Sequence, residues 1–108
     1  MSGSDGGVGG GGGFDYDLPC DNLRFEAQLT SPQPAVVTTL VVAEVLDIVI
    51  NTMNDQVVLQ VLKNGQVAGG LAGPDATRLR NCIEQGHQYK ATVRLVNSGQ
   101  VRVLIEHA

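Results

Sequence analysis

Residues 57–71 read VVLQVLKNGQVAGGL, and this stretch decides the fold class. Two apolar runs flank Asn64-Gly65, a pair that favours a type I′ turn because both central positions of that turn need positive φ. Residues 57–62 predict one strand. Residues 66–71 predict a shorter one, whose Gly69-Gly70 pair indicates a bulge or a close backbone approach. The stretch is therefore predicted to be a β-hairpin.

Upstream of this hairpin, apolar residues recur at every second position. Residues 23–30 alternate and predict a half-buried strand, which the prolines of 31–34 end because proline donates no ladder hydrogen bond. Residues 45–50 predict a second strand, and 51–55 its turn. Residues 35–42 fit either a short helical turn or a strand.

Downstream of the hairpin, the period changes and then returns to two. Gly73-Pro74-Asp75 is typical of a helix start, and Ala76, Leu79 and Ile83 then recur at helical spacing up to a capping Gly86. Residues 89–105 alternate again about a turn at 97–100, which predicts a second hairpin.

This order predicts a mainly β domain over residues 20–108: a small antiparallel barrel of five or six strands, with one helix before the final hairpin. The 108-residue chain is long enough for one domain, and with four aromatic residues and no tryptophan its core must be aliphatic. A closed barrel also removes exposed strand edges.

Residues 1–19 are predicted to be a disordered, glycine-rich tail. Met1 to Gly13 are nearly all glycine and serine, a composition typical of a flexible tether. Phe14 to Leu18 alternate apolar and acidic residues. They are either a short interaction motif or a contact that pins the start of the domain to its own surface, and the tail itself could be the functional element.

The stretch from Val45 to Val103 resembles a HIRAN-type domain, a relative of the OB-like small barrels. The resemblance is carried by the strand with Leu46-Asp47-Ile48, by the hairpin into Val67 to Leu71, and by the helix that opens at Gly73-Pro74 and ends in Glu84-Gln85-Gly86. It implies binding of a single-stranded DNA end through aromatic stacking and basic residues. Gly70 stands where that family is expected to have an aromatic residue, which puts this activity in doubt.

A nucleic-acid interface is therefore one functional hypothesis. The basic residues on predicted outward positions would contact phosphates without base stacking. Pairing across the final turn is expected to bring Arg94 near Arg102. The candidate set is Lys63, Arg78, Arg80, Lys90, Arg94 and Arg102. From Asp21 onward, however, the sequence contains eight acidic and seven basic residues. Most nucleic-acid-binding proteins have a strongly basic composition instead.

The leading hypothesis is a protein-interaction or self-assembly module, either a homo-oligomer or an accessory subunit. Several predicted strands are apolar on both faces, and one helix cannot cover two such faces in so small a domain. The candidate contact residues are Phe14, Tyr16, Leu18, Val58 and Leu62.

No catalytic residue, metal site, cofactor or small-molecule substrate is predicted. His87 and His107 are expected at exposed ends, and no Ser/His/Asp or Cys/His pattern has supporting local sequence. Cys20 and Cys82 lack the spacing of a metal site, and they are expected to stay reduced rather than to pair.

The chain shows no apolar run near the ~20 residues that span a bilayer and no basic, apolar secretory start. We therefore expect a cytoplasmic, bacterial protein with no membrane contact.

Overall fold

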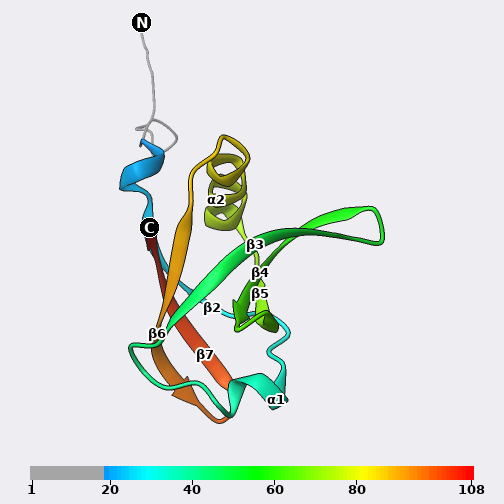
Figure 1. Ribbon diagram of the computed structural model, residues 1–108, viewed down its shortest axis with the longest axis vertical. Coiled ribbons are helices and arrows are strands. Elements are labelled where there is room, and N and C mark those ends of the chain that lie inside the picture. The colour runs from blue at the N-terminus through cyan, green and yellow to red at the C-terminus, as the bar shows by residue number, and fades with distance from the viewer. Residues whose placement is uncertain (1–18) are drawn as a thin grey trace, which may run out of the picture.

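The computed structural model describes residues 19–108, and Figure 1 shows their arrangement. After a short 3-10 turn, η2 (Cys20–Asn22), the chain forms strands, one short helix and one longer helix, in an order that follows the predicted one. The elements are β2 (Arg24–Gln28), α1 (Pro34–Val37), β3 (Val45–Met53), β4 (Gln56–Lys63), β5 (Gln66–Leu71), α2 (Pro74–Glu84), β6 (Tyr89–Asn97) and β7 (Gln100–His107).

The six strands form one antiparallel sheet in the order β2-β7-β6-β3-β4-β5. The mainly β class and the single longer helix before the last hairpin are confirmed. The closed barrel is wrong, because only an isolated bridge between Thr30 and Gly70 joins the chain after β2 to the strand at the other edge. Ser31 and Pro32 turn the chain away at this point, so no ladder extends from the bridge.

Turn chemistry defines the three hairpins. Asn64 and Gly65 have φ values of 51° and 82°, and Ser98 and Gly99 have 52° and 85°, as type I′ turns require. The turn predicted over 51–55 is shorter than expected, because β3 continues to Met53 and only Asn54 and Asp55 take positive φ. Residues 35–42 adopt the helical alternative, since α1 includes Ala35 to Val37.

The core is aliphatic, as predicted. Among the buried residues of the described chain, Tyr89 is the one aromatic residue. On α2 the inward residues Ala76, Leu79 and Cys82 belong to the same buried cluster as the sheet residues. Val61, Val93 and other valines of the sheet complete it. This packing fixes the helix on one face of the sheet.

Small residues in β5 allow a close backbone approach at the sheet edge. A Cβ atom on Gly69 would lie 2.9 Å from the Leu29 Cβ and 3.0 Å from the Thr30 carbonyl oxygen. The Thr30 and Gly70 main chains exchange two hydrogen bonds of 2.8 Å beside it. The close approach predicted for Gly69-Gly70 is therefore confirmed.

We expect Gly69→Ala to lower the free energy of unfolding by roughly 1–3 kcal/mol, because the added methyl group overpacks a site closed by backbone. Urea denaturation of the purified chain measures this. Gln66→Ala, on an exposed position of the same strand, is the control and should change stability by no more than about 0.5 kcal/mol. An unchanged urea midpoint for Gly69→Ala would contradict this prediction. It would mean that the backbone at residues 29–30 moves to accommodate the methyl group without loss of stability.

Candidate functional site

The outer parts of β3 and β4 leave the body of the sheet as a two-stranded arm, residues 48–58. The two strands pair with each other from Asp47↔Leu62 to Met53↔Gln56. On its other side, β3 pairs with β6 only as far as Asp47↔Lys90. Pairing of β4 with β5 begins only at Leu59. Figure 1 shows the arm in green, extending away from the rest of the molecule.

The arm carries apolar side chains that its own domain leaves open to solvent. Met53 is 48% exposed and Val57 is 42% exposed. They lie on opposite faces of the arm, because side chains alternate along a strand and Met53 pairs with Gln56, the neighbour of Val57. Val49 and Val58 add two half-buried valines. The arm is therefore apolar on both faces, and no third strand of the described chain pairs with it on its β3 side or its β4 side.

A shallow groove of about 370 Å³ lies at the base of the arm. Its floor is largely apolar, and the chain that follows β2 supplies polar side chains to its rim. The lining residues are Thr30, Ser31, Gln33, Met53, Val58, Leu59, Gln60, Val67, Gly69, Gly70, Leu71 and Ala72. The groove thus joins the arm to the sheet edge at β5.

The predicted interaction residues fall in different places. Val58 lies on the arm and lines the groove. Leu62 is half-buried in the body of the sheet, opposite Asp47 on β3 and Val67 on β5. Phe14, Tyr16 and Leu18 lie outside the described residues. Sequence reasoning missed Met53 and Val57 as a pair, because it ended β3 at Ile50.

Three of the six predicted nucleic-acid-binding residues lie beside acids. The Lys63 ammonium is 2.9 Å from the Glu44 carboxylate and also donates to the Thr39 carbonyl at 2.8 Å. The hydrogen bond from Lys63 lowers the pKa of Glu44, and one from the Val41 main chain adds to this effect. Arg94 lies 3.9 Å from Glu26 of β2.

Lys90 stands in a row of alternating charges across four strands. Reading along the sheet, Arg24 faces Glu106, Glu106 faces Lys90, and Lys90 faces Asp47. The Arg24 Nε atom is 3.0 Å from a Glu106 oxygen. Opposite charges at neighbouring cross-strand positions stabilise a sheet by a few tenths of a kcal/mol each. The row therefore stabilises the pairing of these four strands.

The structure does not gather the basic residues into one patch. Arg78 and Arg80 belong to α2, whereas Arg102 belongs to the first residues of β7. Figure 1 shows the turn between β6 and β7 at the end of the molecule away from α2. Leu95 rather than Arg94 is the register partner of Arg102, because β6 has a bulge between Val93 and Leu95, and Arg94 lies within that bulge. The buried Nε atom of Arg80 has no hydrogen-bond partner within the described part of the chain.

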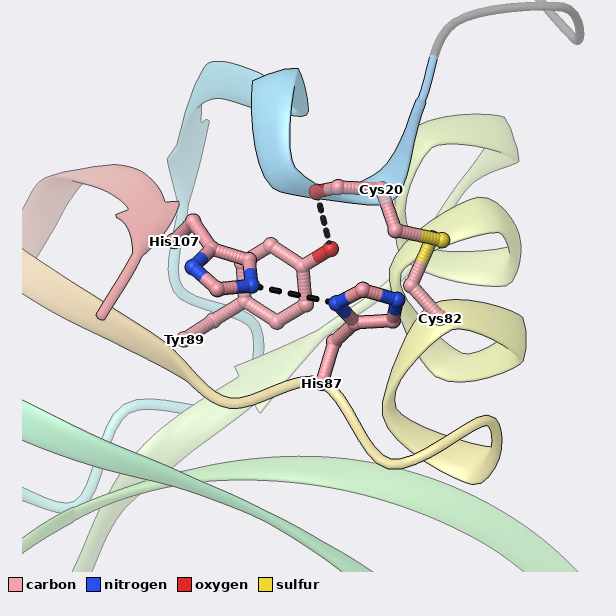
Figure 2. Close-up of a disulfide and its surroundings, with 5 residues drawn as sticks. All are labelled: Cys20, Cys82, His87, Tyr89 and His107. Atoms are coloured by element: carbon pink, nitrogen blue, oxygen red, sulfur yellow. Dashed lines mark hydrogen bonds between the residues drawn. A yellow bond between two sulfur atoms is a disulfide. The ribbon is translucent and has the colours of Figure 1, made fainter.

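A second cluster joins the two ends of the described chain, as Figure 2 shows. The His87 Nδ1 atom lies 3.1 Å from the His107 Nε2 atom, and the His107 ring meets the Tyr89 ring edge to face at a centroid distance of 5.2 Å. The Tyr89 hydroxyl donates to the Cys20 carbonyl oxygen. The expectation of exposed histidines is wrong, because antiparallel pairing sets His107 opposite Tyr89.

Burial raises the pKa of Tyr89, and the negative charge of Asp21 raises it further. The neutral phenol is the form that donates to Cys20, so both causes favour the protonated state.

Cys20 and Cys82 form a disulfide, which corrects the prediction that they stay reduced. Their Cα atoms are 5.6 Å apart across 62 residues of sequence. The turn η2 brings Cys20 against α2, where Cys82 is already on the buried face. Sequence spacing alone cannot show this proximity, because it depends on where η2 packs.

Within residues 19–108, no group of three or more histidine, cysteine or acidic side chains is arranged to hold a metal ion. In the same range, no helix has the length and apolar character needed to cross a membrane. Comparison with known proteins finds no matching family model, no matching curated protein and no matching solved structure.

We expect the Cys20→Ser/Cys82→Ser double variant to lose about 4 kcal/mol of stability, because the unfolded chain regains the freedom of a loop of this length. Denaturant unfolding with and without a reducing agent measures this. Wild-type protein in reducing agent should match the variant. Two free thiols by thiol titration of the native, unreduced protein would show that the bond is absent in solution.

The phenol of Tyr89 should titrate above pH 10 in the folded protein. In a Tyr16→Phe chain, Tyr89 is the one remaining tyrosine, and absorbance at about 295 nm follows its ionisation. Since its folded pKa is raised, stability should fall as the pH rises above the unfolded value of about 10. A folded midpoint at or below the midpoint measured in denaturant contradicts this.

Proposed function

We propose that this chain is a non-enzymatic protein-interaction module and that its β3–β4 arm, residues 48–58, is the binding element. The observation that carries the proposal is the end of β3–β6 pairing at Asp47, which leaves the outer half of β3 with β4 on one side and no strand of the described chain on the other. An open strand edge offers main-chain donors and acceptors to an incoming strand.

The side chains of the arm support the same conclusion. Met53 and Val57 are each close to half exposed, so they add little to the core of their own domain. Covering the exposed part of such a side chain would contribute roughly 1 kcal/mol. A two-stranded hairpin is also marginally stable alone in water, so a partner strand would order the arm as well as cover it.

The HIRAN-like nucleic-acid hypothesis has less support. Lys63 and Arg94 lie next to carboxylates, and Lys90 faces an acid on each side in the cross-strand row. A phosphate would have to compete with these acids for the basic side chains. Arg78 and Arg80 belong to α2, whereas Arg102 follows the β6–β7 turn, which Figure 1 shows at the end of the molecule away from α2.

The disulfide bears on where the module works. The cytoplasmic expectation assumed reduced cysteines, and the bond between Cys20 and Cys82 removes that support. Disulfides persist where the surroundings are oxidising. We therefore favour an oxidising compartment, and trapping of free thiols in intact cells reads out the state of the two cysteines directly.

The test compares three immobilised proteins in an extract of the source cells: the wild type, an arm variant and a charge-matched control. The arm variant Met53→Glu/Val57→Asp adds two negative charges to the exposed faces of the arm. The control Gln66→Glu/Asn97→Asp adds the same charge at exposed positions of two other hairpins. We expect the wild type and the control to retain the same proteins, and the arm variant to lose at least about tenfold of each, a difference of 1.4 kcal/mol.

Equal retention by all three proteins would contradict the proposal. Nuclease treatment of the extract distinguishes nucleic-acid binding from protein binding. Retained material that disappears with nuclease, and with Arg94→Glu/Arg102→Glu, would assign nucleic acid as the ligand instead.

A further inference from the structure

The two imidazoles beside the disulfide come from distant parts of the chain and meet through one nitrogen each. His87 lies in the loop between α2 and β6, and His107 is the last residue of β7. Figure 2 shows the rings directed toward each other, with His87 Nδ1 3.1 Å from His107 Nε2. The sequence contains two histidines, so both are in this pair. The pair is not part of the arm, and the proposed function does not use it.

The hydrogen bonds of the pair determine where each neutral ring carries its proton. The His107 Nδ1 atom lies 3.0 Å from the Ala108 main-chain oxygen, which can only accept a hydrogen bond, so Nδ1 is the protonated nitrogen. His107 Nε2 then carries a lone pair and accepts from His87 Nδ1. A histidine whose second nitrogen donates to a main-chain oxygen has the tautomer and orientation typical of metal ligands. His107 thus presents Nε2 in the form that binds a metal.

The distance between the two nitrogens matches that of two imidazoles on one metal ion. At metal–nitrogen distances of about 2.0–2.1 Å, ligands that subtend about 90–109° have their nitrogens roughly 2.8–3.4 Å apart. The 3.1 Å of this pair lies in that range. The ring centroids are 5.3 Å apart, so the rings meet nearly end to end. Each ring must therefore turn by roughly 35–45° to direct its lone pair at a shared ion. Both rings are half-buried and lie outside the buried core cluster, so this turn does not require the core to repack.

The charged groups around the pair favour a cation. The Tyr89 ring packs against His107, and the Asp21 carboxylate is close enough to the Tyr89 phenol to raise its pKa. Lys90 follows Tyr89 in β6, but side chains alternate along a strand, so its ammonium group lies on the other face of the sheet. An acid on the same side and a base on the opposite face lower the cost of placing a positive ion between the histidines.

We propose that His87 Nδ1 and His107 Nε2 together bind one divalent transition-metal ion, with Cu²⁺ bound more tightly than Zn²⁺. Imidazole nitrogens suit both ions, and this order of affinity is general for such ligands. The proton on His87 Nδ1 leaves as the metal takes that lone pair, and Nε2 of the same ring takes up a proton from solvent, so the charge of the two rings does not change. Water completes the coordination shell, because within residues 19–108 no group of three such side chains is arranged around an ion.

The experiment titrates the full, disulfide-bonded chain near neutral pH with copper chloride and, separately, with zinc chloride, and follows binding by calorimetry. The chain has no other histidine, and both of its cysteines are in the disulfide. We expect one ion per chain. His87→Asn and His107→Gln should each raise the dissociation constant at least about tenfold. The control Gln88→Ala changes an exposed neighbour and should leave the constant unchanged within a factor of about two to three.

Nitrogen NMR of the imidazoles gives a second readout that needs no variant. Without metal, both rings should carry their proton on Nδ1. With zinc, the proton of His87 should be on Nε2, whereas that of His107 should stay on Nδ1. Absence of binding overturns the inference, as does binding that both histidine variants retain. A bound ion that leaves the imidazole signals of the wild type unchanged also overturns it, because that ion is held elsewhere on the chain.

Discussion

The unequal pairing of β3 with its two neighbours is the constraint on which the architecture of this protein depends. β3 pairs with β4 from Asp47 to Met53 but pairs with β6 only from Val45 to Asp47. Because β6 begins at Tyr89, directly after the end of α2 and its following loop, no chain is available beside the outer half of β3. The arm, its open edge and its half-exposed apolar residues all result from this mismatch.

The opposite corner of the molecule is closed by contacts of a different kind. The disulfide, the Tyr89 hydroxyl and the pair of imidazoles connect η2, α2, β6 and β7 around one point (Figure 2). The disulfide stabilises the folded domain, because a covalent link lowers the conformational entropy of the unfolded chain. These contacts all belong to the body of the domain, and none of them involves a residue of the arm.

The charged side chains of the sheet lie next to charges of opposite sign. Acids and bases alternate across the row from Arg24 to Asp47, and Glu44 holds Lys63. Basic residues that alternate along a strand in the sequence are therefore partly neutralised by acids from strands distant in the sequence. Sequence position alone does not show these acidic neighbours, because they come from strands that become adjacent only in the sheet.

Local chemistry in the sequence determined the secondary structure. The turns at Asn64-Gly65 and Ser98-Gly99, the helix start at Pro74 and the period-two strands follow from φ preferences and from alternation, which act over a few residues. The tertiary structure alone decided the open sheet, the Cys20–Cys82 bond, the contact of His87 with His107 and the arm beyond Asp47. Each of these depends on which distant segments become neighbours and where their register stops, and no short-range signal in the chain encodes that.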